Sequence, residues 1–268
     1  MKKVAILLTL CVVLLSGCSR KPVEFTTRQM EGHQLLLYSD DERPHYVENS
    51  YSVAWPADGL MSGEAERELL IACFGDSTAT TFEEASQRWL RSLWTEDPEL
   101  EGSVVSGIPD TVEYSYYHLE SDCIQDSSLA KFNVKAEWYG AGAAHGLYSF
   151  TTLTVDKATG NVVHLPDLVT DTNLLCEAIA RAIQDLETNR EVRDCLFDEF
   201  RDAERMPMPG NFGIDSARNG IIVDYGLYEI APYACGIQSV VLPIFWLSKH
   251  VSLTPYAKRL FGPGSYLE

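Results

Sequence analysis

The sequence is 268 residues long, a length that suits one large domain or two modest ones. Its 46% hydrophobic and 22% charged residues exclude a disordered chain, a collagen-like repeat and a polytopic membrane protein. Its formal charge of −18 repels the phosphate backbone, which argues against a nucleic-acid partner and favours a cationic one.

The N-terminus resembles a bacterial export signal followed by a lipid attachment site. Two lysines precede an apolar run from Val4 to Leu15, which is shorter than the roughly 20 residues of a transmembrane helix. The sequence Leu-Ser-Gly-Cys then ends at Cys18 and resembles a lipobox, at which the signal is cut and the cysteine is acylated. We predict a signal peptide over residues 1–17 and a lipidated Cys18; the alternative is a simple signal peptide with an incidental cysteine.

These features predict a location in the bacterial cell envelope, on the periplasmic or cell-surface face of a membrane. Residues 18–26 form the expected tether between the acylated cysteine and the folded part. No later stretch reaches about 18 uninterrupted apolar residues, so the lipid is the expected link to the membrane.

The first half of the chain contains strand and helix patterns. Runs rich in Val, Leu, Tyr and Thr predict strands over residues 24–30, 34–38 and 46–55. Apolar residues at helical spacing predict helices over residues 64–74 and 82–94, the second with Thr81 as its N-cap. Strict alternation predicts two further strands, over residues 111–119 and 130–139, in a sheet with one solvated face.

The second half continues with hairpins and shorter helices. Expected hairpins pair residues 150–156 with 161–165 and residues 212–216 with 220–225. A helix capped by Asp171 or Thr172 is expected, with one apolar face formed by Leu175, Ile179, Ala182, Ile183 and Leu186. Further expected elements are a helix over residues 192–200, a strand over 239–242 and helices over 244–250 and 255–260. Because strands and helices do not alternate regularly, we predict an α+β fold with mainly antiparallel sheets and packed helices.

The cysteines leave several pairings open. Cys11 leaves with the signal and Cys18 is acylated, so five thiols remain in an exported chain: Cys73, Cys123, Cys176, Cys195 and Cys235. Export permits up to two disulfides, whose pairing the sequence does not give. No two cysteines have the spacing of a zinc site, and we assign no metal and no cofactor.

Three stretches together resemble the RsiV-like extracytoplasmic domain family. They are the turn from Tyr139 to Gly146 (Tyr-Gly-Ala-Gly-Ala-Ala-His-Gly), the hairpin from Phe150 to Leu168, and the segment from Tyr228 to Gly236 (Tyr-Glu-Ile-Ala-Pro-Tyr-Ala-Cys-Gly). The resemblance implies an N-terminal companion domain over residues 27–148 and the RsiV-like domain over residues 149–268. Ala143 and Gly146 depart from the glycine and proline that the family often has.

The resemblance implies a fold and a surface location, and we predict a binding module without catalysis. In the lysozyme-sensing anti-sigma factor this kind of module binds lysozyme, a small basic enzyme, and the acidic charge of this chain complements such a partner. The expected ligand is a basic hydrolase such as lysozyme, or a cell-wall glycan; acidity for solubility alone is the competing explanation of the charge. The sigma-binding segment has no counterpart here, so sigma-factor release is not implied. The competing class is a cell-envelope hydrolase or deacetylase-type enzyme that uses His145 with nearby carboxylates.

The candidate binding residues are His145, Tyr139, Glu229 and Tyr233. His145 lies in a turn of small residues, either as an accessible binding group or as a ring that fixes the turn. Tyr139 belongs to an aromatic concentration that either contacts a ligand or, for half of its members, fills the core. Glu229 and Tyr233 lie in the third motif, whose alternative role is a structural corner.

One segment resembles a catalytic motif. Gly75-Asp76-Ser77 resembles the nucleophile block of Gly-Asp-Ser-Leu esterases, in which an Asp-x-x-His supplies the base. None of the six histidines has an aspartate three residues before it. Because the segment follows a helical pattern, we predict a helix C-terminal turn and assign no catalytic residue.

Overall fold

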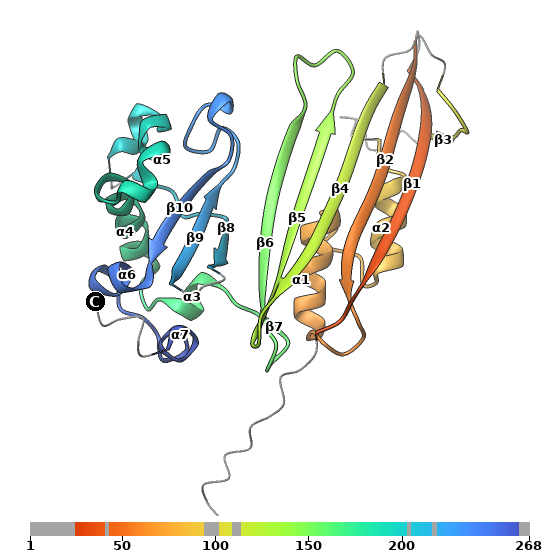
Figure 1. The fold of residues 1–268 in the computed structure, drawn as a ribbon. Helices are drawn as coiled ribbons and strands as arrows, with labels where there is room; N and C mark the ends of the chain where they lie inside the picture. Colours follow the sequence, from red (N-terminus) through yellow and green to blue (C-terminus); the bar gives the residue numbers. More distant parts are fainter. Residues whose placement is uncertain are drawn as a thin grey trace, which may run out of the picture.

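The computed structural model describes residues 25–40, 43–93, 102–108, 114–202, 205–215 and 219–262. Within these ranges the chain forms two lobes that lie side by side, each a β-sheet with helices on one face (Figure 1). The predicted α+β class with mainly antiparallel sheets is confirmed. The predictions for the signal peptide and Cys18 lie outside the described residues.

The larger lobe is built on a seven-stranded sheet. Its strands are β1 (Thr27–Asp40), β2 (Arg43–Pro56), β3 (Ser103–Val104), β4 (Tyr114–Gln125), β5 (Leu129–Tyr139), β6 (Leu147–Asp156) and β7 (Asn161–Val162). Their order in the sheet is β3-β1-β2-β4-β5-β6-β7, and β2 and β4 are its parallel neighbours. A parallel pair needs a crossover, and two helices lie in this connection.

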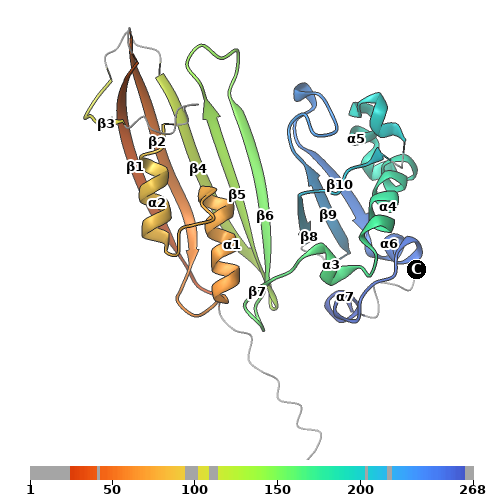
Figure 2. The ribbon, with the colours of Figure 1, turned by 180° about the vertical axis from the view of Figure 1, so that it is seen from behind.

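Helices α1 (Gly63–Phe74) and α2 (Phe82–Leu90) cover one face of this sheet (Figure 2). Their ends follow local sequence rules: Thr81 accepts a hydrogen bond from Glu84 N, and Gly75 ends α1 in the left-handed conformation, with φ 69°. The predicted N-cap and the predicted turn at Gly75-Asp76-Ser77 are therefore confirmed. Edge-to-face rings fill the core beneath the helices, with the centroids of Phe74 and Phe82 5.3 Å apart.

The smaller lobe has a three-stranded antiparallel sheet in the order β10-β9-β8. Its strands are β8 (Asn211–Ile214), β9 (Gly220–Tyr225) and β10 (Gln238–Pro243). Its helices are α3 (Leu165–Leu168), α4 (Thr172–Asp185), α5 (Arg190–Cys195), α6 (Ile244–His250) and α7 (Pro255–Phe261), with 3-10 turns η1 (Glu187–Asn189), η2 (Asp198–Arg201) and η4 (Tyr233–Cys235). Leu175, Ile179 and Ile183 bury one face of α4 against the sheet, as predicted from their spacing.

The two sheets divide after β7. β5 and β6 pair along their length, from Leu129–Asp156 to Trp138–Leu147, so residues 147–162 complete the larger sheet. The expected boundary between residues 148 and 149 falls inside β6, which belongs to the larger sheet. The resemblance places this hairpin in the second domain but does not show which sheet it joins. The helix-free side of the smaller sheet approaches β6 so closely that a Cβ on Gly213 would lie 3.4 Å from Thr152 Cγ2.

Two elements differ from the sequence prediction in ways that packing explains. β1 is one continuous strand where the pattern predicts two. Its pairing with β2 continues through Gly32, where the Tyr51 ring occupies the space that a side chain would take. The helix expected over residues 192–200 ends at Cys195, since Phe197 leaves the helix to donate a backbone hydrogen bond to Ile230 O at 3.0 Å.

The cysteines resolve into one disulfide and three thiols within the described chain. Cys195 pairs with Cys235, whereas Cys73, Cys123 and Cys176 are free. Among the described residues no helix is long and apolar enough to cross a membrane.

Candidate functional site

The loop between β9 and β10 is held in place by its own side chains. Gly226 N donates to Glu229 Oε2 at 2.7 Å, and Glu229 N donates to Gly226 O at 3.2 Å, so this carboxylate closes the turn. Ile230 is fully buried, and its carbonyl accepts the bond from Phe197. The first half of the loop is thus anchored in the core of the smaller lobe.

Tyr228 has an unusual conformation within this loop. Its φ is 65°, the one positive value among the described residues other than glycine, and the residue is 54% exposed. The left-handed region costs an L-residue roughly 1–2 kcal/mol. Strained residues of this kind cluster at binding and active sites, where the surrounding structure maintains them.

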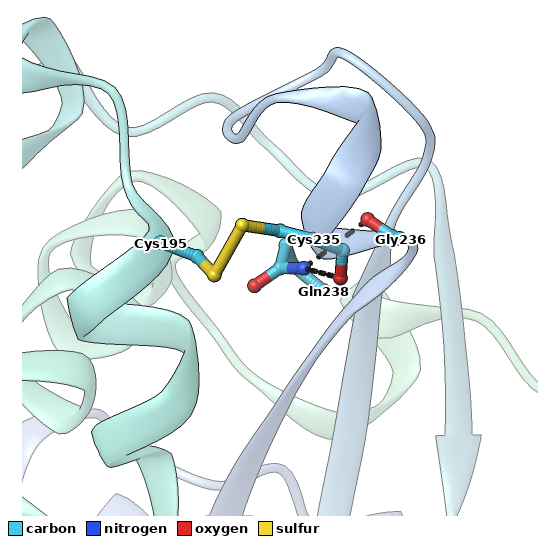
Figure 3. Close-up of a disulfide and its surroundings, with 4 residues drawn as sticks. All are labelled: Cys195, Cys235, Gly236 and Gln238. Atoms are coloured by element: carbon cyan, nitrogen blue, oxygen red, sulfur yellow. Dashed lines mark hydrogen bonds between the residues drawn. A yellow bond between two sulfur atoms is a disulfide. The ribbon is translucent and has the colours of Figure 1, made fainter.

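The second half of the loop is fixed by a covalent bond. Cys235, at the end of η4, is joined to Cys195 at the end of α5 (Figure 3). The Gln238 amide donates to the carbonyls of Cys235 and Gly236 at 2.7 and 3.1 Å. Tyr233, at the start of η4, therefore has a rigid base.

Tyr233 crosses from the smaller lobe to the turn between β5 and β6. Its ring stacks on His145 with centroids 4.0 Å apart and planes 23° apart, and Tyr228 lies 5.8 Å from Tyr233 on the same measure. Tyr233 OH donates to Gly146 O at 2.9 Å, and His145 Nδ1 lies 3.0 Å from the same oxygen. We call these three side chains, Tyr228, Tyr233 and His145, the aromatic bridge.

A second group of rings lies beside the aromatic bridge, on the sheet face that α1 and α2 leave open. Tyr116 stacks on Tyr139 at 5.8 Å and lies 4.7 Å from His118. Burial, and then the neighbouring Glu137, raise the pKa of Tyr116. A Cβ on Gly146 would lie 3.6 Å from Tyr116 OH, so this group and the bridge are neighbours.

The aromatic concentration divides between the two faces as alternation predicts. Tyr117 and Trp138 stack on each other at 5.5 Å on the helix-covered face, where Tyr117 also meets Trp89 at 5.2 Å. Tyr116 and Tyr139 alternate with them and face the open side.

Two of the four predicted binding residues belong to the aromatic bridge, and the other two lie outside it. His145 and Tyr233 contact each other directly, and Tyr139 lies in the neighbouring group. Glu229 uses its carboxylate inside its own turn and so shapes the loop. The prediction omits Tyr228, because the sequence carries no signal for its positive φ.

The surroundings of His145 contain no catalytic partner within the described chain. No hydrogen bond joins its ring to a carboxylate or a hydroxyl there, and its ring nitrogen partner is the backbone oxygen of Gly146. The described ranges also hold no group of three or more His, Cys, Asp and Glu side chains arranged to bind a metal ion.

Comparisons with known proteins find a family match within the smaller lobe and similar solved structures. Residues 166–244 match the DUF3298 family, described as a protein of unknown function, and this range contains the β9–β10 loop. A crystal structure of a DUF3298 family member from Bacteroides fragilis is similar, with a TM-score of 0.59 and 16% identity over 89% of this chain and 98% of that one. A DUF3298 family protein from Pseudomonas aeruginosa has a TM-score of 0.51 and 13% identity over 88% and 97%.

These likenesses extend over both lobes and show a shared fold. A search of curated proteins finds no match to the sequence. The family description names neither a ligand nor a reaction.

Proposed function

We propose that this chain is a lipid-anchored binding module of the bacterial cell envelope that recognises a basic protein through the aromatic bridge. The single observation that carries the proposal is Tyr228, an exposed tyrosine held in a strained conformation beside Tyr233 and His145. Rigid aromatic side chains on the surface are common anchors of protein interfaces, since they bury much area and lose little entropy.

Charge supports a basic partner. The chain carries thirty-nine acidic residues against twenty-one basic ones, and opposite net charge accelerates encounter. Glu229 adjoins the bridge, and Glu137 lies beside Tyr116 in the neighbouring group of rings. A basic hydrolase such as lysozyme, the partner implied by the RsiV-like resemblance, has the matching charge.

A cell-wall glycan is the second candidate ligand. The stacked pair of Tyr116 and Tyr139 on the open sheet face supports it, because sugar rings pack on exposed aromatic faces. The two candidates differ in their dependence on salt, since attraction between net charges is screened and stacking is not.

Calorimetric titration with lysozyme tests the proposal. We expect micromolar or tighter binding that persists at physiological salt, and a loss of about tenfold or more in the Tyr228→Ala and Tyr233→Ala variants. Leu174→Ala, which removes an exposed apolar side chain from α4, is the matched control and should bind normally. Heat that disappears with added salt, or equal binding by all variants, would refute a specific site.

The anchor is tested separately. Metabolic labelling with an alkyne fatty acid should mark the wild-type chain in the membrane fraction and leave the Cys18→Ser variant unlabelled. Labelling that persists in this variant would contradict lipidation at Cys18.

A further inference from the structure

Two adjoining hollows lie on the seam between α1 and the smaller lobe, away from the aromatic bridge. The first, of about 610 Å³, is lined by α1, the β6–β7 hairpin and the first turns of α3 and α7. The second, of about 430 Å³, continues between α1, β6 and β8. They share Glu68, Val162, Val163 and His164, and together we call them the seam cleft. Ligand sites commonly have such volumes, and they commonly form between structural units.

The first hollow is acidic. Its carboxylates are Glu64, Glu68, Asp156 and Asp167, and the described residues that line the two hollows include no lysine or arginine. A concave surface lined by one sign of charge concentrates the potential inside it. The seam cleft therefore attracts cations and repels anions.

The acidic groups are held by polar partners that also line the first hollow. Tyr256 OH donates to Asp156 Oδ2 at 3.0 Å, and His164 N donates to Asp167 Oδ2 at 2.8 Å. Glu68 Oε1 lies 3.2 Å from His164 Nε2. These bonds fix the walls of the hollow.

One face of α1 lines the whole seam with a stripe that the core does not explain. Glu64, Glu68 and Ile71 recur at helical spacing; Ile71 is 39% exposed, and Glu64 forms no ion pair among the described residues. Like charges four residues apart on a helix repel each other. A bound cation would relieve this repulsion, and an apolar chain attached to it would cover Ile71.

An unpartnered polar group lies beside the seam. Thr154 is 2% exposed, and its Oγ1 has no hydrogen-bond partner among the described residues. On β6 it lies between Thr152 and Asp156, which line the second and the first hollow respectively. Buried hydroxyls are normally bonded, but Thr154 itself lines neither hollow, so its Oγ1 is not part of the cleft wall.

We propose that the seam cleft binds an organic cation, namely an amine or guanidinium group carried on an apolar chain. The charged group lies among Glu64, Glu68 and Asp156, and the chain lies along Ile71 and Phe212 in the second hollow. Such chemistry has two sources, a free aliphatic diamine or the basic side chain of a peptide. This site is independent of the aromatic bridge.

The test is calorimetry on the full chain in detergent. The probes are 1,6-diaminohexane for the free source and acetyl-Lys-Leu-amide for the peptide source, with 1,6-hexanediol as the uncharged analogue. The variants are Glu64→Gln/Glu68→Gln and Ile71→Asn, and the matched control is Glu191→Gln/Glu199→Gln, which removes two exposed carboxylates outside the cleft lining. Circular dichroism confirms that each variant is folded.

We expect saturable binding of at least one cationic probe and none of the diol. The seam variants should weaken it roughly tenfold or more, while the control binds as the wild type does. The probe that binds more tightly identifies the source. Equal weakening in the seam and control variants would reduce the effect to overall acidity and overturn the proposal, as would the absence of binding by both cations or equal binding of the diol.

Discussion

The side-chain amide of Asn211 forms the hydrogen bonds to Thr152 N and Phe150 O that the backbone of a paired strand would form. Its Oδ1 accepts from Thr152 N at 2.7 Å, and its Nδ2 donates to Phe150 O at 3.2 Å. Asn189 does the same for β10, with bonds to the backbone N and O of Val241 at 2.9 and 3.0 Å. Each asparagine satisfies outward-facing backbone groups on the edge of a strand, which would otherwise be available for pairing with another chain.

Replacement of Asn211 should loosen the junction between the lobes. In Asn211→Ala both bonds to β6 are lost, and we expect a loss of about 1–3 kcal/mol in the free energy of unfolding. Hydrogen exchange of the Thr152 amide should accelerate, while exchange in the β4–β5 pair should not change. A Thr152 amide as protected as in the wild type would show that Asn211 is dispensable to the junction.

Glycine at position 228 should relieve the strain there. We expect Tyr228→Gly to be more stable than Tyr228→Ala by about 1 kcal/mol, because alanine keeps the unfavourable positive φ and glycine does not. Urea denaturation of the two variants measures the difference, and both should lose binding to the basic partner. Equal stability of the two variants would mean that the backbone at this position carries no strain.

Loss of the disulfide should affect both stability and recognition. The bond between Cys195 and Cys235 closes a loop across 40 positions, so Cys195→Ser/Cys235→Ser should lower the free energy of unfolding by about 2–4 kcal/mol. Because Cys235 ends the turn that carries Tyr233, binding through the aromatic bridge should weaken as well. Cys176→Ser is the control, and a disulfide variant that binds normally would separate the bond from the site.

Asp76 should contribute stability that depends on pH. Hydrogen bonds from the Thr78 hydroxyl and backbone, together with Ala79 N and Arg88, hold the pKa of this carboxyl well below its usual range. A lowered folded-state pKa gives stability that is present above the unfolded pKa of about 3.9 and is lost as pH falls. Asp76→Asn should therefore lower Tm at pH 7, and the gap to the wild type should narrow below about pH 4. A gap that is constant with pH would contradict this role.

Thiol reactivity should follow burial. Burial raises the pKa of Cys73 to about 12 and that of Cys123 to about 11, so both remain protonated and unreactive near neutral pH. Alkylation of the folded protein at pH 8, followed by peptide mass spectrometry, should leave Cys73 largely unmodified, while the denatured chain reacts fully. Rapid labelling of Cys73 in the folded state would show that the core under α1 opens readily.

Features that depend on neighbouring residues could be predicted from the sequence. Thr81 and Asp171 cap their helices because a side-chain oxygen needs only the amides two or three residues further on. The split of the aromatic residues between sheet faces followed from period two alone. These rules hold whatever the rest of the chain does.

Features that depend on contacts between residues far apart in the sequence could not be predicted from it. Tyr233 reaches Gly146 across 87 positions, and nothing near either residue indicates the other. The positive φ of Tyr228 occurs in a loop that is anchored at both ends. The seam cleft is lined by six elements without a shared motif, namely α1, α3, α7, β6, β7 and β8. His145 and Tyr233 could therefore be named as candidates, but their contact could not.

The parallel pairing of β2 with β4 fixes an order of assembly. Ala54 N is satisfied by Ser121 Oγ, 67 positions later, and the inner face of β2 is buried by helices that also come after it. Because synthesis proceeds from the N-terminus, the β1–β2 hairpin must stand without its neighbours until β4 has been made. Loop closure over this distance is slow relative to a hairpin, so the first hairpin remains exposed to aggregation until the middle of the chain arrives.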